Sequence, residues 1–246
     1  MLHADHIGSL LRPPELLEAR DANLAGSVPA AELTRLEDEA IVRALAMQKD
    51  AGLQIFSDGE YRRTWFSGAM ESAIEGLAAD PDPTIDHRAM WRGEHASEAV
   101  ATGEKYHIAQ QKAVAKLRAT DRLTKDEADF LRVNAPGPFK IALTGPTHYA
   151  IMWFRAGATD AYGTPLDLLS EVTDITRAEV AALVAEGIDY VQLDSLMYVV
   201  GIFDDADGSM YDAMIASDNE VLAPSARGRR DDGAPHVPGQ QPQRLG

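Results

Sequence analysis

The fold is decided by Phe139-Lys140-Ile141-Ala142-Leu143-Thr144-Gly145-Pro146-Thr147-His148, an apolar run that ends in small and polar residues. Buried parallel strands read as continuous apolar runs, and enzymes built from them collect polar side chains at the carboxyl ends of the strands. Three further apolar runs end in the same way, on His6-Ile7-Gly8-Ser9, Asp58-Gly59-Glu60 and Gln192-Leu193-Asp194-Ser195. This recurrence predicts an α/β protein in which several strand ends share one ligand site.

Helical segments separate the predicted strands. From Pro29, apolar residues recur at three- and four-residue spacing until Gly52, and a short strand is predicted over 53–56. A second helix is predicted over 165–186, followed by a strand over 189–194. Strand, helix and strand at this spacing form a βαβ unit, which implies a parallel sheet with right-handed crossovers.

Length and composition favour one main domain. The chain has 246 residues and 45% apolar content, which suits a single α/β barrel. We predict a partial barrel of about four to five βα units over residues 1–222. A helical or irregular insertion over 64–138 interrupts the alternation, and a capping-box spacing there predicts a helix starting at Thr124. Residues 223–246 are dominated by Pro, Gly, Arg and Gln, so we expect a disordered tail.

Charge and cysteine content exclude several classes of function. Acidic residues outnumber basic ones 39 to 23, so attraction to nucleic acid or to an anionic membrane is disfavoured. No apolar run reaches the roughly 18 residues of a membrane span, and no signal peptide is evident, so we expect a cytoplasmic protein. Cysteine is absent from the 246 residues, which excludes disulfides and thiolate chemistry supplied by this chain.

The four strand-end clusters, taken in order, resemble the cobalamin-independent methionine synthase family. They resemble its catalytic C-terminal barrel and the shorter bacterial and archaeal relatives of that barrel, within the wider uroporphyrinogen decarboxylase and methionine synthase superfamily. The matching segments are Ile7-Gly8-Ser9, Gly59-Glu60 with Arg62 for the family's Gly-Glu-x-x-Arg, Leu143-Thr144-Gly145-Pro146, and Gln192-Leu193-Asp194. The resemblance implies a (β/α)₈ TIM barrel, present here in truncated form.

The resemblance also implies a reaction. The family transfers a methyl group from a methylated folate to the thiol of homocysteine in methionine biosynthesis, with zinc holding the sulfur as a thiolate. By resemblance the substrate-binding residues are Ile7, Gly8, Ser9, Glu60 and Asp194, with Ser9 on the carboxylate of the amino acid and the two acidic residues on its ammonium. The implied residues lining the folate side of the pocket are Gly145, Pro146, His148 and Trp153. Catalytic residues stay unassigned.

Each of these residues also has a structural interpretation. Ser9 could cap the following helix, and Glu60 could form a surface ion pair with the neighbouring arginines. His148 could be a hydrogen-bonded structural residue, and Trp153 could simply pack in the core. Asp194, at a strand end, is the strongest candidate for a functional role.

Two departures from the family pattern bear on activity. Ser195 follows Asp194 where the family's methionine synthases have Glu-Pro, so the substrate need not be homocysteine. The family's zinc ligands are a His-x-Cys pair, a glutamate and a second cysteine on later strands, and this chain has no cysteine. We therefore assign no metal ligand, expect no complete zinc site in this chain, and predict that it is inactive alone.

The tail suggests a cause. Codons compatible with residues 231–245, read one nucleotide later, permit a His-x-Cys pair. We hypothesise a reading-frame change after about Leu222, which the encoding DNA would test. Two other functions are compatible with the sequence. One is another enzyme of the superfamily, such as a coenzyme M or corrinoid methyltransferase or a uroporphyrinogen decarboxylase. The other is a non-catalytic amino-acid-binding module. Enzymatic activity therefore stays open.

Overall fold

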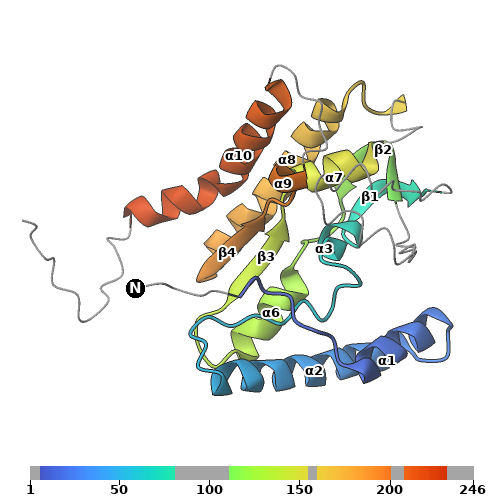
Figure 1. The fold of residues 1–246 in the computed structure, drawn as a ribbon, viewed down its shortest axis with the longest axis vertical. Coiled ribbons are helices and arrows are strands. Elements are labelled where there is room, and N and C mark those ends of the chain that lie inside the picture. Colours follow the sequence, from blue (N-terminus) through green and yellow to red (C-terminus); the bar gives the residue numbers. More distant parts are fainter. Residues whose placement is uncertain (1–5, 81–110, 155–159, 201–207, 232–246) are drawn as a thin grey trace, which may run out of the picture.

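The computed structural model describes residues 6–80, 111–154, 160–200 and 208–231 (Figure 1). The described elements are, in chain order, α1 (Pro14–Leu24), α2 (Ala30–Asp50), α3 (Gly68–Glu71), β1 (Ile74–Ala79), β2 (Gln111–Ala119), α6 (Lys125–Asn134), β3 (Lys140–Thr144), α7 (Pro146–Trp153), α8 (Pro165–Ala185), β4 (Tyr190–Asp194), α9 (Met197–Val200) and α10 (Ser209–Asp231). Helices and strands alternate along much of the chain, which confirms the α/β class.

The predicted parallel pairing is present at the centre of the molecule. Strands β3 and β4 pair in parallel, from Lys140 opposite Tyr190 to Thr144 opposite Asp194. A parallel bridge joins Phe56 to Phe139, just before β3. Thr144 and Asp194 therefore end their strands side by side, and the segment that leads to Glu60 enters beside the start of β3.

The strands are fewer than a barrel requires. The described residues form two two-stranded sheets and no closed barrel, so the barrel architecture stays a prediction. The predicted strand over 53–56 is reduced to the bridge, and residues 6–9 form no strand. Side chains satisfy backbone groups that a neighbouring strand would otherwise pair. Gln48 bonds both the N–H and the C=O of Ser57, at 2.9 and 2.8 Å, and His6 contacts the Ile55 carbonyl at 3.0 Å.

The two long predicted helices are confirmed. Helix α2 ends just before Gly52, whose φ of 80° is a left-handed conformation that glycine adopts readily. Helix α8 begins with a capping box between Thr164 and Asp167. The predicted capping box at Thr124 is wrong, although α6 does start at the next residue. The Thr124 hydroxyl instead donates to Glu179 on α8, at 2.7 Å.

The insertion and the tail differ from the sequence-based description. Strands β1 and β2, within 64–138, form an antiparallel hairpin-like pair. Helix α10 continues through Pro224 to Asp231, so the segment over 223–246 begins as helix, where the sequence predicts disorder. Residues 232–246 lie outside the described part of the chain. The domain boundaries themselves stay predictions.

Helix α8 joins two hydrophobic clusters. In one it packs with α2, α6 and β3, and in the other with α7 and β2. Representative members of the first cluster are Ile41, Leu131, Ile141, Val180 and Leu183, and of the second Met70, Ala113, Tyr149, Trp153 and Leu168. Within the described residues, no helix is both long and apolar enough to cross a membrane. The first cluster supports the strand ends where the candidate site lies.

Candidate functional site

Gly8 and Glu60 are brought together although 52 positions separate them in the sequence. Gly8 is buried with a φ of 127°, and a Cβ placed on it would lie 3.6 Å from Oε1 of Glu60. The Ser57 hydroxyl holds this turn by donating to the Gly8 carbonyl at 2.7 Å. The backbone of the amino-terminal segment therefore passes directly against the Glu60 carboxylate.

Asp194 is linked to the same segment through Gln192. The Gln192 amide nitrogen donates to Oδ1 of Asp194 at 2.7 Å and to the Ile7 carbonyl at 2.6 Å. The buried Lys140 ammonium donates to the Gln192 side-chain oxygen at 2.8 Å and also to the His6 carbonyl. Because Lys140 can only donate, it fixes which end of the Gln192 amide faces Asp194.

Glu60 has an unusual backbone and an unsatisfied carboxylate. It is only 3% exposed and has a φ of 57°, a left-handed conformation that is uncommon outside glycine. Oδ1 of Asp58 accepts its backbone N–H at 2.9 Å. Oε2 of Glu60 and Oδ2 of Asp58 are both buried and have no hydrogen-bond partner. Buried polar atoms without partners are rare in proteins, and they mark places where a ligand or water can supply the missing bond.

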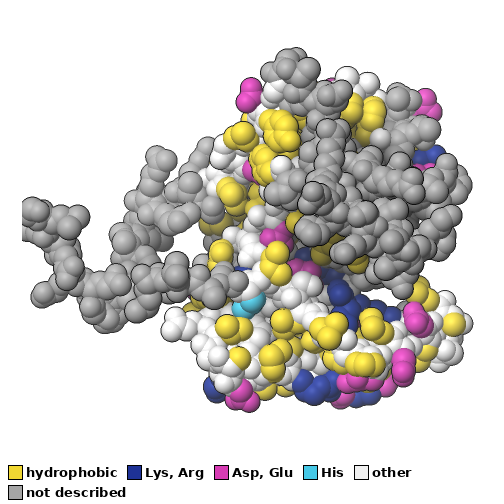
Figure 2. Space-filling view, viewed as in Figure 1, with side chains coloured by type: hydrophobic (Ala, Val, Ile, Leu, Met, Phe, Trp, Pro, Cys, Tyr) yellow, Lys and Arg dark blue, Asp and Glu magenta, His cyan; other side chains and the backbone are white. Residues whose placement is uncertain are grey.

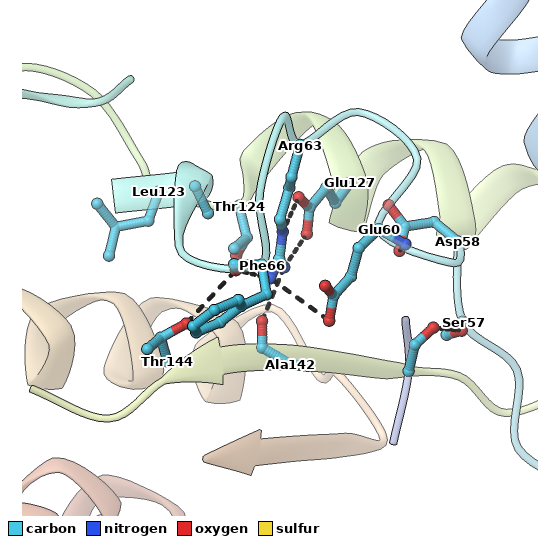
Figure 3. Close-up of polar contacts among 12 residues, drawn as sticks. Ser57, Asp58, Glu60, Arg63, Phe66, Leu123, Thr124, Glu127, Ala142 and Thr144 are labelled. Atoms are coloured by element: carbon cyan, nitrogen blue, oxygen red, sulfur yellow. Dashed lines mark hydrogen bonds and ion pairs between the residues drawn. The ribbon is translucent and has the colours of Figure 1, made fainter. Parts of the chain in front are cut away.

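A buried arginine lies beside Glu60 (Figure 3). Arg63 donates to both oxygens of Glu127 on α6, at 2.7 and 2.6 Å, and to the Ala142 carbonyl on β3 at 2.7 Å. Its Nη1 atom lies 3.7 Å from Oε1 of Glu60. The Gly-Glu-x-x-Arg spacing, counted from Gly59, ends on Arg63, whereas the sequence comparison paired Glu60 with Arg62.

Arg62 points away from Glu60, and the Gly-Glu-x-x-Arg spacing could have identified Arg63 in its place. Arg62 contacts Glu37 and Asp38 on α2. Glu127 was also missed, because nothing in the local sequence of α6 distinguishes it from a surface glutamate. Its role comes from packing alone.

Two arginines near α1 hold the loop that carries these residues. Arg12 donates to the carbonyls of Glu60 and Arg63, at 2.9 and 2.7 Å, and Arg20 donates to the Arg63 carbonyl at 2.8 Å. Figure 2 shows basic side chains gathered above α1 and α2 on this face. A cavity of about 610 Å³ nearby is lined in part by Arg63 and Glu127. The loop is thus anchored by its backbone, and its carboxylates are left for other contacts.

The electrostatics of the cluster favour a cationic ligand. Burial raises the pKa of Glu60, and Arg63 opposes that shift. Burial, with the nearby Glu127 carboxylate, raises the pKa of Asp58 to about 7. Burial also raises the pKa of Asp194, which Glu60 senses electrostatically. A cation placed among these groups would stabilise their ionised forms.

The residues after β3 that the sequence assigns to the folate side of the pocket are largely buried. The Gly145 N–H donates to the Asp194 carbonyl at 2.9 Å, and a Cβ on Gly145 would lie 2.8 Å from Oγ of Ser195, so only glycine fits. Pro146 starts α7 and is buried. Burial lowers the pKa of His148 to about 4, so the ring is neutral at pH 7. Trp153 is 2% exposed within the second hydrophobic cluster, which fits the packing interpretation.

The amino-terminal residues are more open. Ile7 is 57% exposed, and Ser9 is exposed beside the buried Gly8. Ser9 does not cap the following helix, because the N-cap of α1 is Pro13 and no side chain caps it. The capping interpretation of Ser9 is therefore wrong. The surface ion-pair interpretation of Glu60 is also wrong, since the side chain is buried and its nearest cation is the equally buried Arg63.

Comparisons with known proteins agree with the resemblance to methionine synthases. The chain is 27% identical over 196 residues to the uncharacterized protein YxjH of Bacillus subtilis, covering 78% of this chain and 47% of that protein. It is 24% identical over 189 residues to the methionine synthase of Sulfolobus acidocaldarius, covering 76% and 50%. This chain is similar to the methionine synthases. No family model matches it.

Solved structures of cobalamin-independent methionine synthases share its fold. One is the B12-independent enzyme from Shewanella sp. W3-18-1 in complex with selenomethionine, with a TM-score of 0.62, 23% identity, and coverage of 80% of this chain and 50% of that one. Another is a putative vitamin-B12 independent methionine synthase from Listeria monocytogenes, with a TM-score of 0.64, 19% identity, and coverage of 90% and 61%. The chain spans about half the length of the curated relatives YxjH and the Sulfolobus methionine synthase.

The residues of this methionine synthase-like chain do not fit a thiolate zinc site. The 246 residues include no cysteine. Among the residues that the structure describes, no three His, Asp or Glu side chains converge as metal ligands. No step involving zinc is therefore derived from this chain. The cluster of Gly8, Glu60 and Asp194 instead offers a buried, unpartnered carboxylate oxygen close to a second carboxylate.

Proposed function

We propose that this chain carries the amino-acid-binding part of a methionine synthase-type S-methyltransferase, built on part of a TIM barrel. The observation that supports this most is the buried, unpartnered Oε2 of Glu60 beside the close-packed Gly8 backbone. The α-ammonium of an amino acid supplies both the hydrogen-bond donor and the positive charge that this carboxylate lacks. Asp194, on the adjacent strand end, would share the same ammonium.

The other end of the amino acid would lie toward the amino-terminal segment. The exposed Ser9 hydroxyl, next to the buried Gly8, would donate to the α-carboxylate. The Gln192 side chain donates a hydrogen bond to the Ile7 carbonyl. This bond would hold the backbone two residues before Ser9 in place. The carboxylates of Glu60 and Asp194 would bind the ammonium, and the Ser9 hydroxyl would bind the carboxylate. Together these contacts would select an α-amino acid.

The proposed substrates are a homocysteine-like thiol and a methylated folate, in methionine biosynthesis in the cytoplasm. In this family zinc converts the thiol to a thiolate nucleophile, and the residues of this chain do not supply that site. The proposed contribution of the chain is to bind and orient the amino acid. Gly145, Pro146 and the neutral His148 would line the folate side of the pocket.

Calorimetry with L-methionine and L-homocysteine tests the proposal. Asp194→Asn and Glu60→Gln should each weaken binding at least about tenfold, which corresponds to about 1.4 kcal/mol. Asp189→Asn is the matched control, because this carboxylate lies just before the opposite end of β4 and accepts from the Phe139 N–H, at 3.4 Å. Its variant should bind like the wild type.

Two results would contradict the proposal. One is a folded wild-type chain that binds neither amino acid, and the other is undiminished binding by both site variants. 4-(Methylthio)butanoate, which lacks the ammonium, should bind at least tenfold more weakly than methionine. Methyl transfer from a methylated folate in the same preparation would separate a methyltransferase from an amino-acid-binding module without catalysis.

A further inference from the structure

Arg63 is shared unequally between two buried glutamates (Figure 3). Its Nε and Nη2 atoms donate to the two oxygens of Glu127 at 2.7 and 2.6 Å. Its Nη1 atom lies 3.7 Å from Glu60, beyond hydrogen-bond distance, and donates to the Phe66 carbonyl at 3.2 Å. The hydrogen bonds of the guanidinium thus go to Glu127 and to the carbonyls of Phe66 and Ala142, and Glu60 receives only a weaker, longer-range attraction.

We propose that Glu127 is a positioning residue that holds Arg63 away from Glu60 and so keeps the Glu60 carboxylate available to a ligand ammonium. The ammonium ligand in this inference rests on the proposed function. The role of Glu127 in holding Arg63 away from Glu60 does not. Glu127 lies on α6, is 5% exposed, and accepts two hydrogen bonds from Arg63. A bidentate carboxylate is the partner that matches the planar fork of a guanidinium best.

The alternative partner for Arg63 is close. Without Glu127, the buried arginine would have Glu60 and Asp58 as its neighbouring carboxylates. A guanidinium cannot lose its charge in a protein, so it would move onto one of them to offset its burial. Nη1 of Arg63 lies 3.7 Å from Oε1 of Glu60, so a small displacement would form a direct pair with that carboxylate. The pair would neutralise the negative charge that the ammonium requires.

Charged groups from several elements act on Glu60. They are Arg12 from the amino-terminal segment, Asp58 and Arg63 from its own loop, Glu127 from α6 and Asp194 from β4. Of these, Arg63 is the cation that approaches its side chain, because Arg12 donates to the backbone carbonyl of Glu60 instead. Displacing Arg63 is therefore the change that would alter Glu60 most.

Crystal structures of the full chain, wild type and Glu127→Gln, test the structural part without any ligand. A glutamine cannot accept both guanidinium bonds, so Arg63 should shift until an Nη atom lies within hydrogen-bond distance of Glu60, about 2.7–3.2 Å. Arg63 remaining where it is, or pairing with Asp58, would overturn the proposal. If Glu127→Gln does not fold, Glu127→Asp withdraws the carboxylate by one methylene and should produce the same shift.

Methionine binding, measured by calorimetry at pH 8, tests the consequence. Glu127→Gln should weaken binding about tenfold, and the double variant Glu127→Gln/Arg63→Gln should recover most of that loss. If Glu127 had a merely structural role, the double variant would bind methionine more weakly than Glu127→Gln, because removing both partners damages the core further. A double variant no better than Glu127→Gln would therefore overturn the inference.

A matched control separates positioning from stability. Glu179→Gln removes another buried glutamate, which pairs with Arg122 and bonds the residues at the start of α6. It should lower stability and leave both the Arg63–Glu60 distance and methionine affinity unchanged. If the wild type binds no methionine but Arg63 still moves in Glu127→Gln, the proposed function fails and the structural role of Glu127 stands.

Discussion

Two arginine–glutamate pairs whose glutamates are buried differ in one respect. Glu179 on α8 accepts five bonds: two from Arg122, two from Thr124 and one from the Leu123 N–H. At the strand ends, Arg63 and Glu127 satisfy each other, but the neighbouring carboxylates of Glu60 and Asp58 each keep one buried oxygen without a partner. One cluster is complete and the other is not.

The difference separates structural from functional polar clusters. A buried carboxylate with every lone pair satisfied stabilises the helices that it joins. A buried carboxylate without partners destabilises the ligand-free chain, and such groups concentrate at binding sites. The satisfied cluster fixes the start of α6 to α8.

The largest expected effect is at the satisfied cluster. Glu179→Gln removes the anion that bonds the start of α6, while Arg122 keeps its ion pair with Glu186. The buried N–H groups of Leu123 and Thr124 lose their charged acceptor, at about 1–3 kcal/mol for each group. Urea unfolding should show that decrease in the free energy of unfolding, and a decrease below about 1 kcal/mol would show that the two clusters do not differ as described.

At the unsatisfied cluster, removing the charge of a carboxylate should raise the stability of the chain, where at Glu179 it lowers it. Asp58 has a pKa of about 7 in the folded chain, raised from 3.8. The folded chain then binds more protons than the unfolded chain between these values, so stability falls as the pH rises from about 4 to 7. At about 1.4 kcal/mol per unit of pKa, the loss is on the order of 4 kcal/mol.

Asp58→Asn should remove that pH dependence. The amide oxygen can still accept the Glu60 N–H, while the buried charge is gone. Thermal unfolding followed from pH 4 to 8 should be flatter in the variant, and the variant should be the more stable of the two at pH 7.5. A wild type whose stability rises over this interval would contradict the assignment.

Local sequence patterns predict the long helices α2 and α8 and the strands β3 and β4 well, but not α7, which replaces the loop expected through His148. The capping residue at Thr164 and the glycines after α2 and α8 mark helix ends by conformational rules that act within a few residues. The parallel pairing of β3 with β4 also follows from the apolar runs. These features depend on residues close in the sequence, so the sequence alone reveals them.

Long-range partners could not be predicted in this way. The strand expected at 53–56 is replaced by contacts from Gln48, and α10 extends into a segment whose composition predicts disorder. In the site, Glu60 and Asp194 were identified by motif, and Arg63 was available from the motif spacing. Glu127 and the Lys140–Gln192 link depend on tertiary packing and carry no local signal.

The structure of the chain with bound L-methionine tests the central claim most directly. If the unpartnered strand-end carboxylates form an amino-acid site, the ammonium nitrogen will lie within hydrogen-bond distance of Oε2 of Glu60 and close to Asp194. The carboxylate will then lie near Ser9, and Arg63 will stay on Glu127. Methionine bound elsewhere, or with its ammonium in solvent and Oε2 of Glu60 still without a partner, would contradict the claim.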